Sequence, residues 1–321
     1  MAFALSPDCR FVVSGNLVRD TIVVGVDRIV YGATTWVESI LPSIGGNGAN
    51  TAYGLGVLGA PVTLISACGD DEAGSASIAQ LESVGVDVAF HPTPDTATAL
   101  TIALVNQQGE RAFLHQPGVN RTALAAPLSF EHAHIPVGRP WHYHLANPFA
   151  LPQFREHAAQ SLTNAQRLGA TTSLDTGWDS KGRWLDDLAP CLPLVDLLFV
   201  NDREAEMLTG FREAGQMVAA LHRLGARRVV LKLGEQGCLL SDEDDREVIP
   251  AYHVPVADTT GAGDAFAAGM LAALFRGLPV IQAASFACAV AGLSVQEPGA
   301  VAGLRGYEAT HAWICEQEAE S

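Results

Sequence analysis

The chain has 321 residues, of which 48% are hydrophobic, and it carries a formal net charge of −16. Its length suits one large α/β domain or two smaller ones, and its hydrophobic content is too high for a disordered chain. The negative charge argues against nucleic-acid backbones and anionic membrane surfaces as partners. It leaves room for a phosphate ligand, because backbone N–H groups and a metal ion can supply a positive field locally.

The cysteines and the N-terminal residues indicate the cellular compartment in which we expect the protein. Cysteines are scattered along the chain without a Cys-x-x-Cys spacing, at Cys9, Cys68, Cys191, Cys238, Cys288 and Cys315. This distribution is typical of reduced, mostly buried thiols and favours neither disulfides nor a zinc site. Residues 1–11 lack the basic region and long apolar stretch of a signal peptide, and no segment is apolar enough over enough length to span a bilayer. We therefore expect a soluble, cytoplasmic protein.

The first part of the chain predicts short strands and two helices. The strands are expected over residues 11–14, 21–24, 34–40 and 61–67, and the helices over residues 49–58 and 71–84. Residues 96–106 and 111–115 predict a hairpin whose alternation is typical of a sheet with one wet face. We interpret these early strands as a small β-sheet lid, drawn from about residues 18–44 and 95–120 and inserted into a single domain of residues 1–321.

Beyond residue 140, short apolar strands alternate with helices. Strands are expected over residues 142–145, 171–174, 197–200, 229–232 and 238–240, and helices over about 154–168, 203–208, 214–224, 260–275, 281–295 and 306–318. This alternation predicts an α/β fold with a mostly parallel central sheet and helices on both faces. Polar or glycine residues follow the strands at Asn147, Asp175, Asn201, Gly234 and Asp258. In open α/β sheets, ligands bind at that edge.

Residues 258–264 read Asp-Thr-Thr-Gly-Ala-Gly-Asp, between a strand-like alternation over residues 248–256 and an apolar helical pattern. A helix N-terminus presents unpaired N–H groups and a positive dipole end, and glycines let that backbone approach an anion. A tight turn capped by Asp264 is the simpler interpretation, but it explains only one Asp and one Gly. We therefore predict an anion-binding turn with a carboxylate at its mouth, as phosphoryl transfer to a hydroxyl requires.

A second glycine-rich run, Gly-Gly-Asn-Gly-Ala-Asn at residues 45–50, also precedes a predicted helix. Alone it could be a tight turn capped by Asn47, because such runs are common before helices. Paired with residues 258–264, it suggests a site in two parts. One run would hold a polyol against its backbone and Asn50, and the other would hold phosphates.

Four motifs resemble, in order and spacing, those of the ribokinase-like (pfkB) carbohydrate kinases. Residues 45–50, continuing to Gly-Asp-Asp-Glu-Ala-Gly at 69–74, resemble the N-terminal signature, and residues 258–264 resemble the C-terminal one. Asn-Asp-Arg-Glu at 201–204 matches the family's Asn-x-x-Glu motif, and residues 234–237 match its Gly-x-x-Gly turn. The resemblance covers essentially the whole chain. It implies a ribokinase-like fold and an ATP-dependent kinase that phosphorylates a sugar hydroxyl, which we expect to be primary.

For catalysis, the resemblance implies that Asp264 is the base that accepts the proton of the substrate hydroxyl. It also implies that the N–H groups of Gly261, Ala262 and Gly263 form an anion hole for charge on the transferring phosphoryl group.

The resemblance also implies two cation sites. Glu204, with Asn201, would position Mg²⁺ and phosphate, since a hard cation that keeps several waters suits one carboxylate acting through water. Without the other motifs, Glu204 would be interpreted as a solvated helix residue. Asp258, with the loop near Gly299, resembles the family's monovalent-cation site, which is usually a potassium site.

The resemblance implies one set of residues that contact the sugar and another set that contact the nucleotide. The sugar would contact Asp20, Gly45, Gly46 and Asn50, although Asp20 could equally be an exposed acid at a strand edge. The nucleotide would contact Asn201, Lys232, Gly234, Gly237 and Thr260. Lys232 ends a predicted buried strand, where a lysine is costly without an anionic partner.

Two residues differ from those of ribokinase itself, and both belong to the part of the site that would bind the sugar. Asn47 stands where ribokinase has a Lys, and Ala146 stands where ribokinase has a Glu, whereas the ATP side is intact. One alternative is a nucleoside kinase of the same fold, for which Trp36 and Phe113 could form an aromatic wall.

A phosphosugar kinase is a further alternative, and it would need basic residues near the lid, for which the candidates are Arg19, Arg28 and Arg111. A non-catalytic sugar sensor would be expected to lack the base or the glycines of residues 258–264, and neither is missing. A dinucleotide dehydrogenase is disfavoured because no Gly-x-Gly-x-x-Gly follows the first strand.

Two further features have structural interpretations. The His-x-His pairs at residues 132/134 and 142/144 are interpreted as structural, because no acid or cysteine completes a metal-ligand set. The alternating lid strands lead to the hypothesis of a homodimer formed through the lid.

Overall fold

The computed structural model describes residues 3–90, 92–108, 110–131, 133, 135, 138–242 and 245–320. Within these residues, a nine-stranded sheet runs through the centre of the molecule. Its strand order is β13-β12-β11-β10-β9-β8-β1-β4-β5. In chain order these strands are β1 (Arg10–Ser14), β4 (Val62–Ile65), β5 (Val86–Val88), β8 (Trp141–Ala146), β9 (Thr171–Asp175), β10 (Leu197–Asn201), β11 (Val229–Lys232), β12 (Cys238–Ser241) and β13 (Arg246–Ile249). Neighbours from β11 to β5 are parallel, and β12 and β13 add an antiparallel edge.

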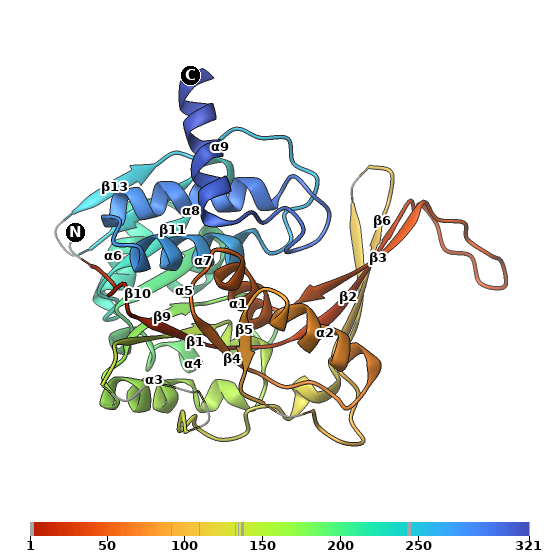
Figure 1. Cartoon of the computed structure of the whole chain (residues 1–321), viewed down its shortest axis with the longest axis horizontal. Coiled ribbons are helices and arrows are strands. Elements are labelled where there is room, and N and C mark those ends of the chain that lie inside the picture. Colours follow the sequence, from red (N-terminus) through yellow and green to blue (C-terminus); the bar gives the residue numbers. More distant parts are fainter. Residues whose placement is uncertain are drawn as a thin grey trace.

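Helices cover both faces of this sheet, as the strand–helix alternation predicted. They are α1 (Asn47–Val57), α2 (Glu72–Glu82), α3 (Ala158–Arg167), α4 (Leu185–Leu188), α5 (Asp202–Thr209), α6 (Ala214–Arg223), α7 (Ala262–Phe275), α8 (Val280–Ser294) and α9 (Tyr307–Glu320). Figure 1 shows α7 and α8 on one side of the sheet and α3 on the other.

The strands separate two hydrophobic cores because successive side chains point to opposite faces. In β1, Phe11 and Val13 join the core that contains α1, α7 and α8, whereas Val12 joins the core that contains α3, α5 and α6. Burial on both faces explains why the strands are continuous apolar runs.

The helices α7 and α8 pack against each other closely because their contact face is built from small residues. A Cβ atom added to Gly269 of α7 would lie 3.0 Å from Ala287 Cα and 3.0 Å from Val290 Cβ of α8. A Cβ on Gly54 of α1 would lie 2.8 Å from Ala268 Cβ of α7. These two glycines therefore let α7 lie close to both neighbours, and α7 carries Asp264 in its first turn.

A separate four-stranded sheet has the order β3-β2-β6-β7. Its strands are β2 (Val18–Val24), β3 (Ser39–Gly45), β6 (Leu100–Val105) and β7 (Arg111–Gln116), and we call it the small sheet. β2 pairs with β6 in parallel and with β3 in an antiparallel ladder, while β6 and β7 form the predicted hairpin. Figure 1 shows the small sheet projecting away from the helix-covered sheet.

Several predicted boundaries differ from the structure. The strand expected over 248–256 ends at Ile249, because Pro250 cannot donate a ladder hydrogen bond. The helix expected from residue 260 begins at Ala262 after Gly261. The strand expected over 34–40 begins at Ser39, and the short elements β5 and α4 were not predicted.

The state of the cysteines and the apolar character of the helices were both considered from the sequence. All six cysteines are free, and five of them are buried. Among the described residues, no helix has the length and apolar character needed to cross a membrane.

Candidate active site

The two glycine-rich runs meet at Asp264. Asn47 Nδ2 donates to Asp264 Oδ1 at 2.9 Å, and Asn50 Nδ2 donates to Asp264 Oδ2 at 2.9 Å. Asn47 and Asn50 lie in the first turn of α1, and Asp264 lies in the first turn of α7. The carboxylate is therefore held at both oxygens by side chains from the opposite end of the chain, at a point where two helix N-termini converge.

Asp264 is buried, with 5% of its surface exposed. Burial raises the pKa of its carboxyl above the usual range, and the negative Glu204 adds to the shift. The hydrogen bonds from Asn47 and Asn50 and the charge of Lys232 oppose it. A carboxylate with a raised pKa is a stronger proton acceptor than an exposed one.

The turn before α7 depends on Gly261. Its φ of 74° lies in the left-handed region, and an added Cβ would lie 2.6 Å from Ala300 Cβ. As the N-cap residue, Gly261 provides no side-chain hydrogen bond to the first turn. The N–H groups at the start of α7 thus lack the usual side-chain cap, which is the arrangement of an anion-binding helix N-terminus.

Lys232, at the end of β11, lies against this turn. Its Nζ is 2.6 Å from Asp175 Oδ2, and a Cβ on Gly263 would lie 3.1 Å from the same Nζ. Burial alone would lower the pKa of Lys232, but the nearby carboxylates of Asp175, Glu204 and Asp264 raise it, so the ammonium stays charged. The predicted need for an anionic partner is met by Asp175, and the cation stands beside the predicted anion hole.

Glu204 is a buried helix residue with 5% of its surface exposed, so the interpretation as a solvated residue is wrong. Glu204 and Asn201 form a capping box at the start of α5, with Glu204 N donating to Asn201 Oδ1 at 2.8 Å. Thr176 Oγ1 and Asn201 N both donate to Glu204 Oε2, at 2.6 and 3.0 Å. Among the described residues, Oε1 of Glu204 accepts no hydrogen bond, which leaves one oxygen for a hydrated cation.

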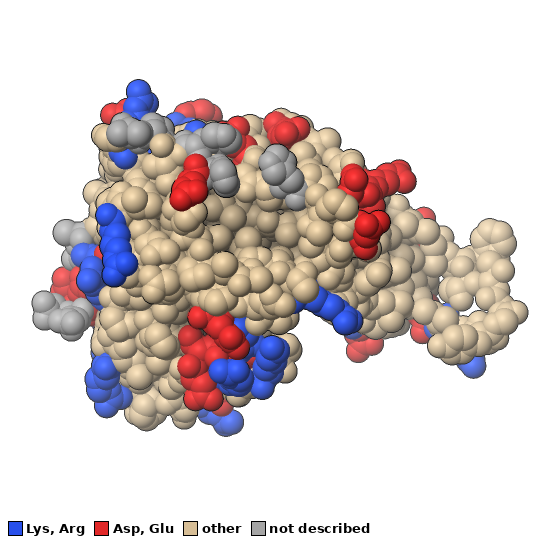
Figure 2. All heavy atoms as spheres, turned by 90° about the horizontal axis from the view of Figure 1, so that it is seen from below, with Lys and Arg blue, Asp and Glu red and all other residues tan. Residues whose placement is uncertain are grey.

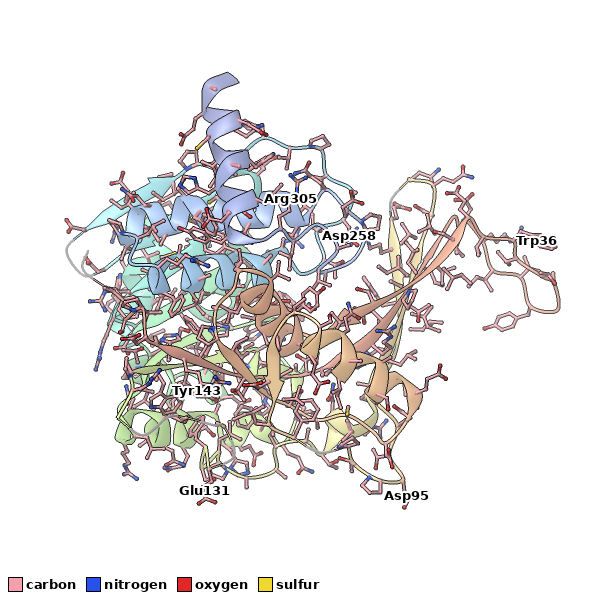
Figure 3. All side chains as sticks on the ribbon, in the orientation of Figure 1. Trp36, Asp95, Glu131, Tyr143, Asp258 and Arg305 are labelled. Carbon is pink, nitrogen blue, oxygen red and sulfur yellow. The ribbon has the colours of Figure 1, made fainter. Side chains whose placement is uncertain are left out.

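Asp258 ties together three segments of the chain. Its Oδ1 accepts a hydrogen bond from Thr260 N at 2.6 Å, and its Oδ2 accepts one from Gly299 N at 2.8 Å. Arg111 Nη1 of the small sheet lies 2.6 Å from Asp258 Oδ1. Figure 3 shows Asp258 on a loop that faces the base of the small sheet.

Asp20 lies against the first glycine-rich run. A Cβ added to Gly45 would lie 2.0 Å from Asp20 Oδ2, so only glycine leaves room for this carboxylate. Gly46 has a φ of 91°, and its added Cβ would lie 2.6 Å from Asn16 O. Burial raises the pKa of Asp20 to about 6, and the negative Asp258 adds to this, while Thr101 and Arg19 oppose it. The alternative of an exposed strand-edge acid is not supported.

A cavity of about 280 Å³ lies beside Asn47. It is lined by Asn16, Asn47, His115, Pro117, Asn120, Asn147, Phe149, Ala150, Pro152, Trp178, Ser180 and Lys181. Asn147 Nδ2 donates to Asn47 Oδ1 at 2.8 Å, so it fixes the residue that in turn binds Asp264. The sequence marked Asn147 as a strand-end residue without a role, and no sequence signal pointed to Lys181.

A smaller cavity of about 30 Å³ is lined by residues of the small sheet, of the loop before α7 and of the loop after α8. The lining includes Asp20, Thr101, Arg111, Phe113, Asp258, Thr260 and Gly299. Phe113 therefore lies near the site. Trp36 does not, since Figure 3 places it far out on the loop between β2 and β3, with 89% of its surface exposed.

The predicted nucleotide residues are only partly gathered by the fold. Asn201 and Lys232 are register partners at the carboxyl ends of β10 and β11. Gly237 has a φ of 90°, and its added Cβ would lie 2.0 Å from Ile249 O, so it serves the turn between β11 and β12. Gly234 has a φ of 60° with open space beside it, and neither glycine lines the two cavities above.

The histidines of β8 form hydrogen bonds with residues of β9. His142 bonds Thr171 Oγ1 and Ser173 Oγ at 2.8 and 2.7 Å, and His144 bonds Ser173 Oγ at 2.7 Å. Burial lowers the pKa of His142 to about 3 and that of His144 as well, so both rings are neutral. Residues 132 and 134 lie outside the described residues. Within those, no group of three or more His, Cys, Asp or Glu side chains could hold a metal ion.

Comparison with known proteins shows the family of the chain. The chain matches the profile of the pfkB family carbohydrate kinases over residues 11–305. It is similar to an ATP-dependent ribose-1-phosphate kinase of Halopiger xanaduensis, with 31% identity over 90% of this chain and 93% of the relative.

Solved structures share the fold. Arabidopsis thaliana ribokinase, complexed with ribose and ATP, matches with a TM-score of 0.79 and 24% identity over 95% of this chain and 98% of its own. A candidate ribokinase II of E. coli, in complex with ATP and Mg²⁺, matches with a TM-score of 0.81 and 21% identity over 96% and 99%. The fold is that of the ribokinase-like kinases. The chain belongs to the pfkB family of carbohydrate kinases.

Proposed function

We propose that this kinase moves the γ-phosphoryl group of ATP to a hydroxyl of a sugar, expected to be primary, with Asp264 as the general base. One observation carries the proposal. A buried carboxylate with a raised pKa stands in the first turn of a helix that lacks a side-chain cap, with a lysine ammonium beside the same turn. That arrangement combines a proton acceptor with an anion-binding helix N-terminus, as phosphoryl transfer to an alcohol requires.

In this proposal Asp264 accepts the proton from the attacking hydroxyl. An ionised carboxylate has about four lone-pair sites, so the hydrogen bonds from Asn47 and Asn50 leave acceptor capacity for a substrate O–H. Those two amides hold the carboxylate in one orientation. The N–H groups of Gly261, Ala262 and Gly263, together with Lys232, would stabilise charge on the transferring phosphoryl group.

Magnesium fits the nucleotide side through Glu204, whose Oε1 is free of hydrogen bonds from the described residues while Oε2 is anchored. Asn201 fixes that orientation through the capping box. When bound with ATP, the ion would neutralise charge on the phosphates. For the remaining contacts to the nucleotide we keep the residues expected from the sequence, which are Lys232, Gly234, Gly237 and Thr260.

The sugar is proposed to lie between Asp20 and Asp264, against the backbone of Gly45 and Gly46 and the side chain of Asn50. Hydroxyl groups donate to an ionised carboxylate, so Asp20 has to be deprotonated to bind two of them. Its pKa of about 6 means that the ionised form is present above that pH and is lost below it.

The pH dependence of acceptor binding follows from Asp20. We expect kcat/KM for the acceptor, which reports the free enzyme, to fall as the pH drops through about 6. Asp20→Asn should give a low kcat/KM without that inflection. Initial rates at limiting acceptor across this pH range measure it. An unchanged inflection in the variant would assign the acid limb to another group.

A phosphorylated sugar is the second candidate acceptor. Of the basic residues considered from the sequence, Arg19 bonds Gln80 and Arg28 lines neither cavity, while Arg111 lines the 30 Å³ cavity but is paired with Asp258. Lys181, in contrast, lines the 280 Å³ cavity and has no ion pair within the described part of the chain. The Halopiger relative is named for ribose 1-phosphate, which agrees with an anionic group at this end. A nucleoside would instead place its base near Trp178 and Phe149 in the same cavity.

A panel of acceptors tests the function. ADP release from Mg²⁺–ATP would be measured with ribose, fructose, other hexoses, ribose 1-phosphate and nucleosides, and with Lys181→Met beside the wild type. Turnover that Asp264→Asn removes would support the kinase proposal. A KM increase in Lys181→Met confined to phosphorylated acceptors would favour the second candidate. ATP binding without turnover on any acceptor would favour a non-catalytic sensor.

The small sheet is proposed to act as a lid on a single domain formed by the whole chain, and to pair with a second copy. Figure 2 shows few charged side chains over its far end, where Ile29, Val30, Tyr31 and Trp36 are exposed. Ile40, Leu41, Phe113 and Leu114 add exposed apolar surface on its strands. Burying such a patch is the usual reason for association. A monomeric mass in solution at micromolar concentration would contradict the dimer.

A further inference from the structure

Arg111, the first residue of β7, joins the small sheet to the loop that leads into α7. Its Nη1 lies 2.6 Å from Asp258 Oδ1 and donates to Thr260 Oγ1 at 2.7 Å. The Arg111 side chain is 19% exposed and that of Asp258 is 7% exposed. The ion pair is therefore largely shielded from water, where a charge pair is much stronger than at an open surface.

Asp258 needs a positive partner because it is both buried and ionised. Burial raises its pKa, but the hydrogen bonds from Thr260 and Gly299 and the charge of Arg111 outweigh this and keep the pKa below the usual range. An ionised carboxylate without a cation is costly in such a position. Arg111 provides that cation from another part of the fold.

A monovalent cation fits poorly beside this carboxylate. Oδ1 already meets Thr260 N and the Arg111 guanidinium, and Oδ2 accepts the hydrogen bond from Gly299 N, so only one lone-pair site on Oδ2 is left for a cation. An added cation would compete with the guanidinium for the same negative charge, and the two positive charges would repel each other. The potassium site expected from the family resemblance therefore disagrees with the contacts of Asp258.

We propose that Arg111 takes the place of a monovalent cation in this kinase, by neutralising Asp258 and holding the loop of residues 258–261. Thr260 directly precedes Gly261 and Asp258 lies two residues before Thr260, so a displacement of either one moves the amides that would form the anion hole. Arg111 acts on the loop and not on the reacting atoms, which makes it a positioning residue. Its effect on turnover rests on the function proposed above.

Because Arg111 belongs to the small sheet, its contact with Asp258 depends on the position of that sheet. In Figure 3, Asp258 faces the base of the small sheet, and Arg111 is the first residue of strand β7 in that sheet. If the small sheet moves away as a lid, the guanidinium leaves Asp258. The position of the lid would then be coupled to the order of the loop before α7.

Exchange of monovalent cations tests the proposal. Rates are compared in potassium, sodium and choline chloride at equal ionic strength and about pH 8, where Asp20 is ionised in every sample. The wild type is expected to give the same kcat in all three. Arg111→Met should lose about 10- to 100-fold in choline chloride, because the loop is misplaced. Potassium or a low concentration of guanidinium should restore part of that loss, and Arg111→Lys should retain more activity than Arg111→Met.

The matched control is Arg19→Met, which removes another arginine of the small sheet. Arg19 bonds Gln80 of α2 and does not line the cavity at Asp258. It lowers the pKa of Asp20, but near pH 8 that carboxylate is well above its pKa of about 6, so this variant should keep the wild-type kcat at saturating acceptor and show no cation dependence. A loss common to both variants would indicate general damage to the small sheet and would overturn the specific role of Arg111.

Thermal unfolding tests the same proposal without a sugar acceptor. Potassium is expected to raise the thermal unfolding temperature of Arg111→Met relative to choline, and to leave that of the wild type unchanged. This measurement still tests the cation role if no sugar is phosphorylated, so failure of the kinase proposal can be told apart from failure of this one. A wild type that potassium activates tenfold or more, or an Arg111→Met variant without cation dependence in either readout, would overturn the proposal.

Discussion

Replacing Asp264 by asparagine is expected to lower kcat by about 10²- to 10⁴-fold while ATP binding is kept, because the proton acceptor is lost and the nucleotide side is untouched. The structure makes the substitution informative, since Asp264 is buried and held at both oxygens by Asn47 and Asn50. Single-turnover phosphorylation and calorimetric titration of ATP would measure the two effects separately.

The substitution also changes one hydrogen bond, which has to be controlled. The new amide NH₂ of Asp264→Asn would face an amide donor of Asn47 or Asn50, so one of these contacts is lost. Asn147→Ala is a useful comparison, because it removes the support of Asn47 without touching the carboxylate. A variant Asp264→Asn that unfolds like the wild type and still turns over at a near-normal rate would refute the proposed base.

Replacing Gly261 by alanine is expected to reduce kcat by about 10²-fold or more, as loss of one well-placed N–H donor does in other anion holes. The added Cβ would lie 2.6 Å from Ala300 Cβ and 2.8 Å from Ala300 O, so the turn must shift away from its position. The amides of residues 261–263 would shift with it. Steady-state kinetics with ATP and the accepted sugar would measure the loss.

Gly277 provides the control for backbone strain. It follows α7 at the other end, has a φ of 81°, and has no atom within 4 Å of an added Cβ. Gly277→Ala should therefore cost only the left-handed strain of roughly 1–2 kcal/mol in stability, with kcat unchanged. Equal kinetic losses in Gly261→Ala and Gly277→Ala would mean that the effect arises from stability and not from the anion hole.

Much of the fold could be predicted because it depends on local patterns. The apolar strands alternating with helices indicated a parallel sheet covered on both faces, and this is confirmed. The two segments expected to form a small β-sheet do so, although one strand was placed too early. The boundary errors occur at Ile249 and Ala262, where a proline and a left-handed glycine set the backbone.

The sequence could propose site residues where their chemistry is carried by a contiguous run. Asp264 and the glycines before it form such a run, and so do Asn201 and Glu204, which are close enough in sequence to form a capping box. Lys232 was expected to need an anionic partner, but the sequence could not indicate that Asp175 is that partner. Lys181 carried no signal, because it belongs to a loop whose place beside the cavity depends on packing.

The sequence by itself therefore determined the class of fold and the family, and it supplied the residues that we propose for phosphoryl transfer, because periodicity and motif spacing are properties of neighbouring residues. Only the tertiary structure decided which side chains restrain them. Asn47 and Asn50 reach Asp264 across more than 200 positions, and Arg111 reaches Asp258 across more than 100. Such contacts follow from how helices and sheets pack, and no local pattern of residues encodes that geometry.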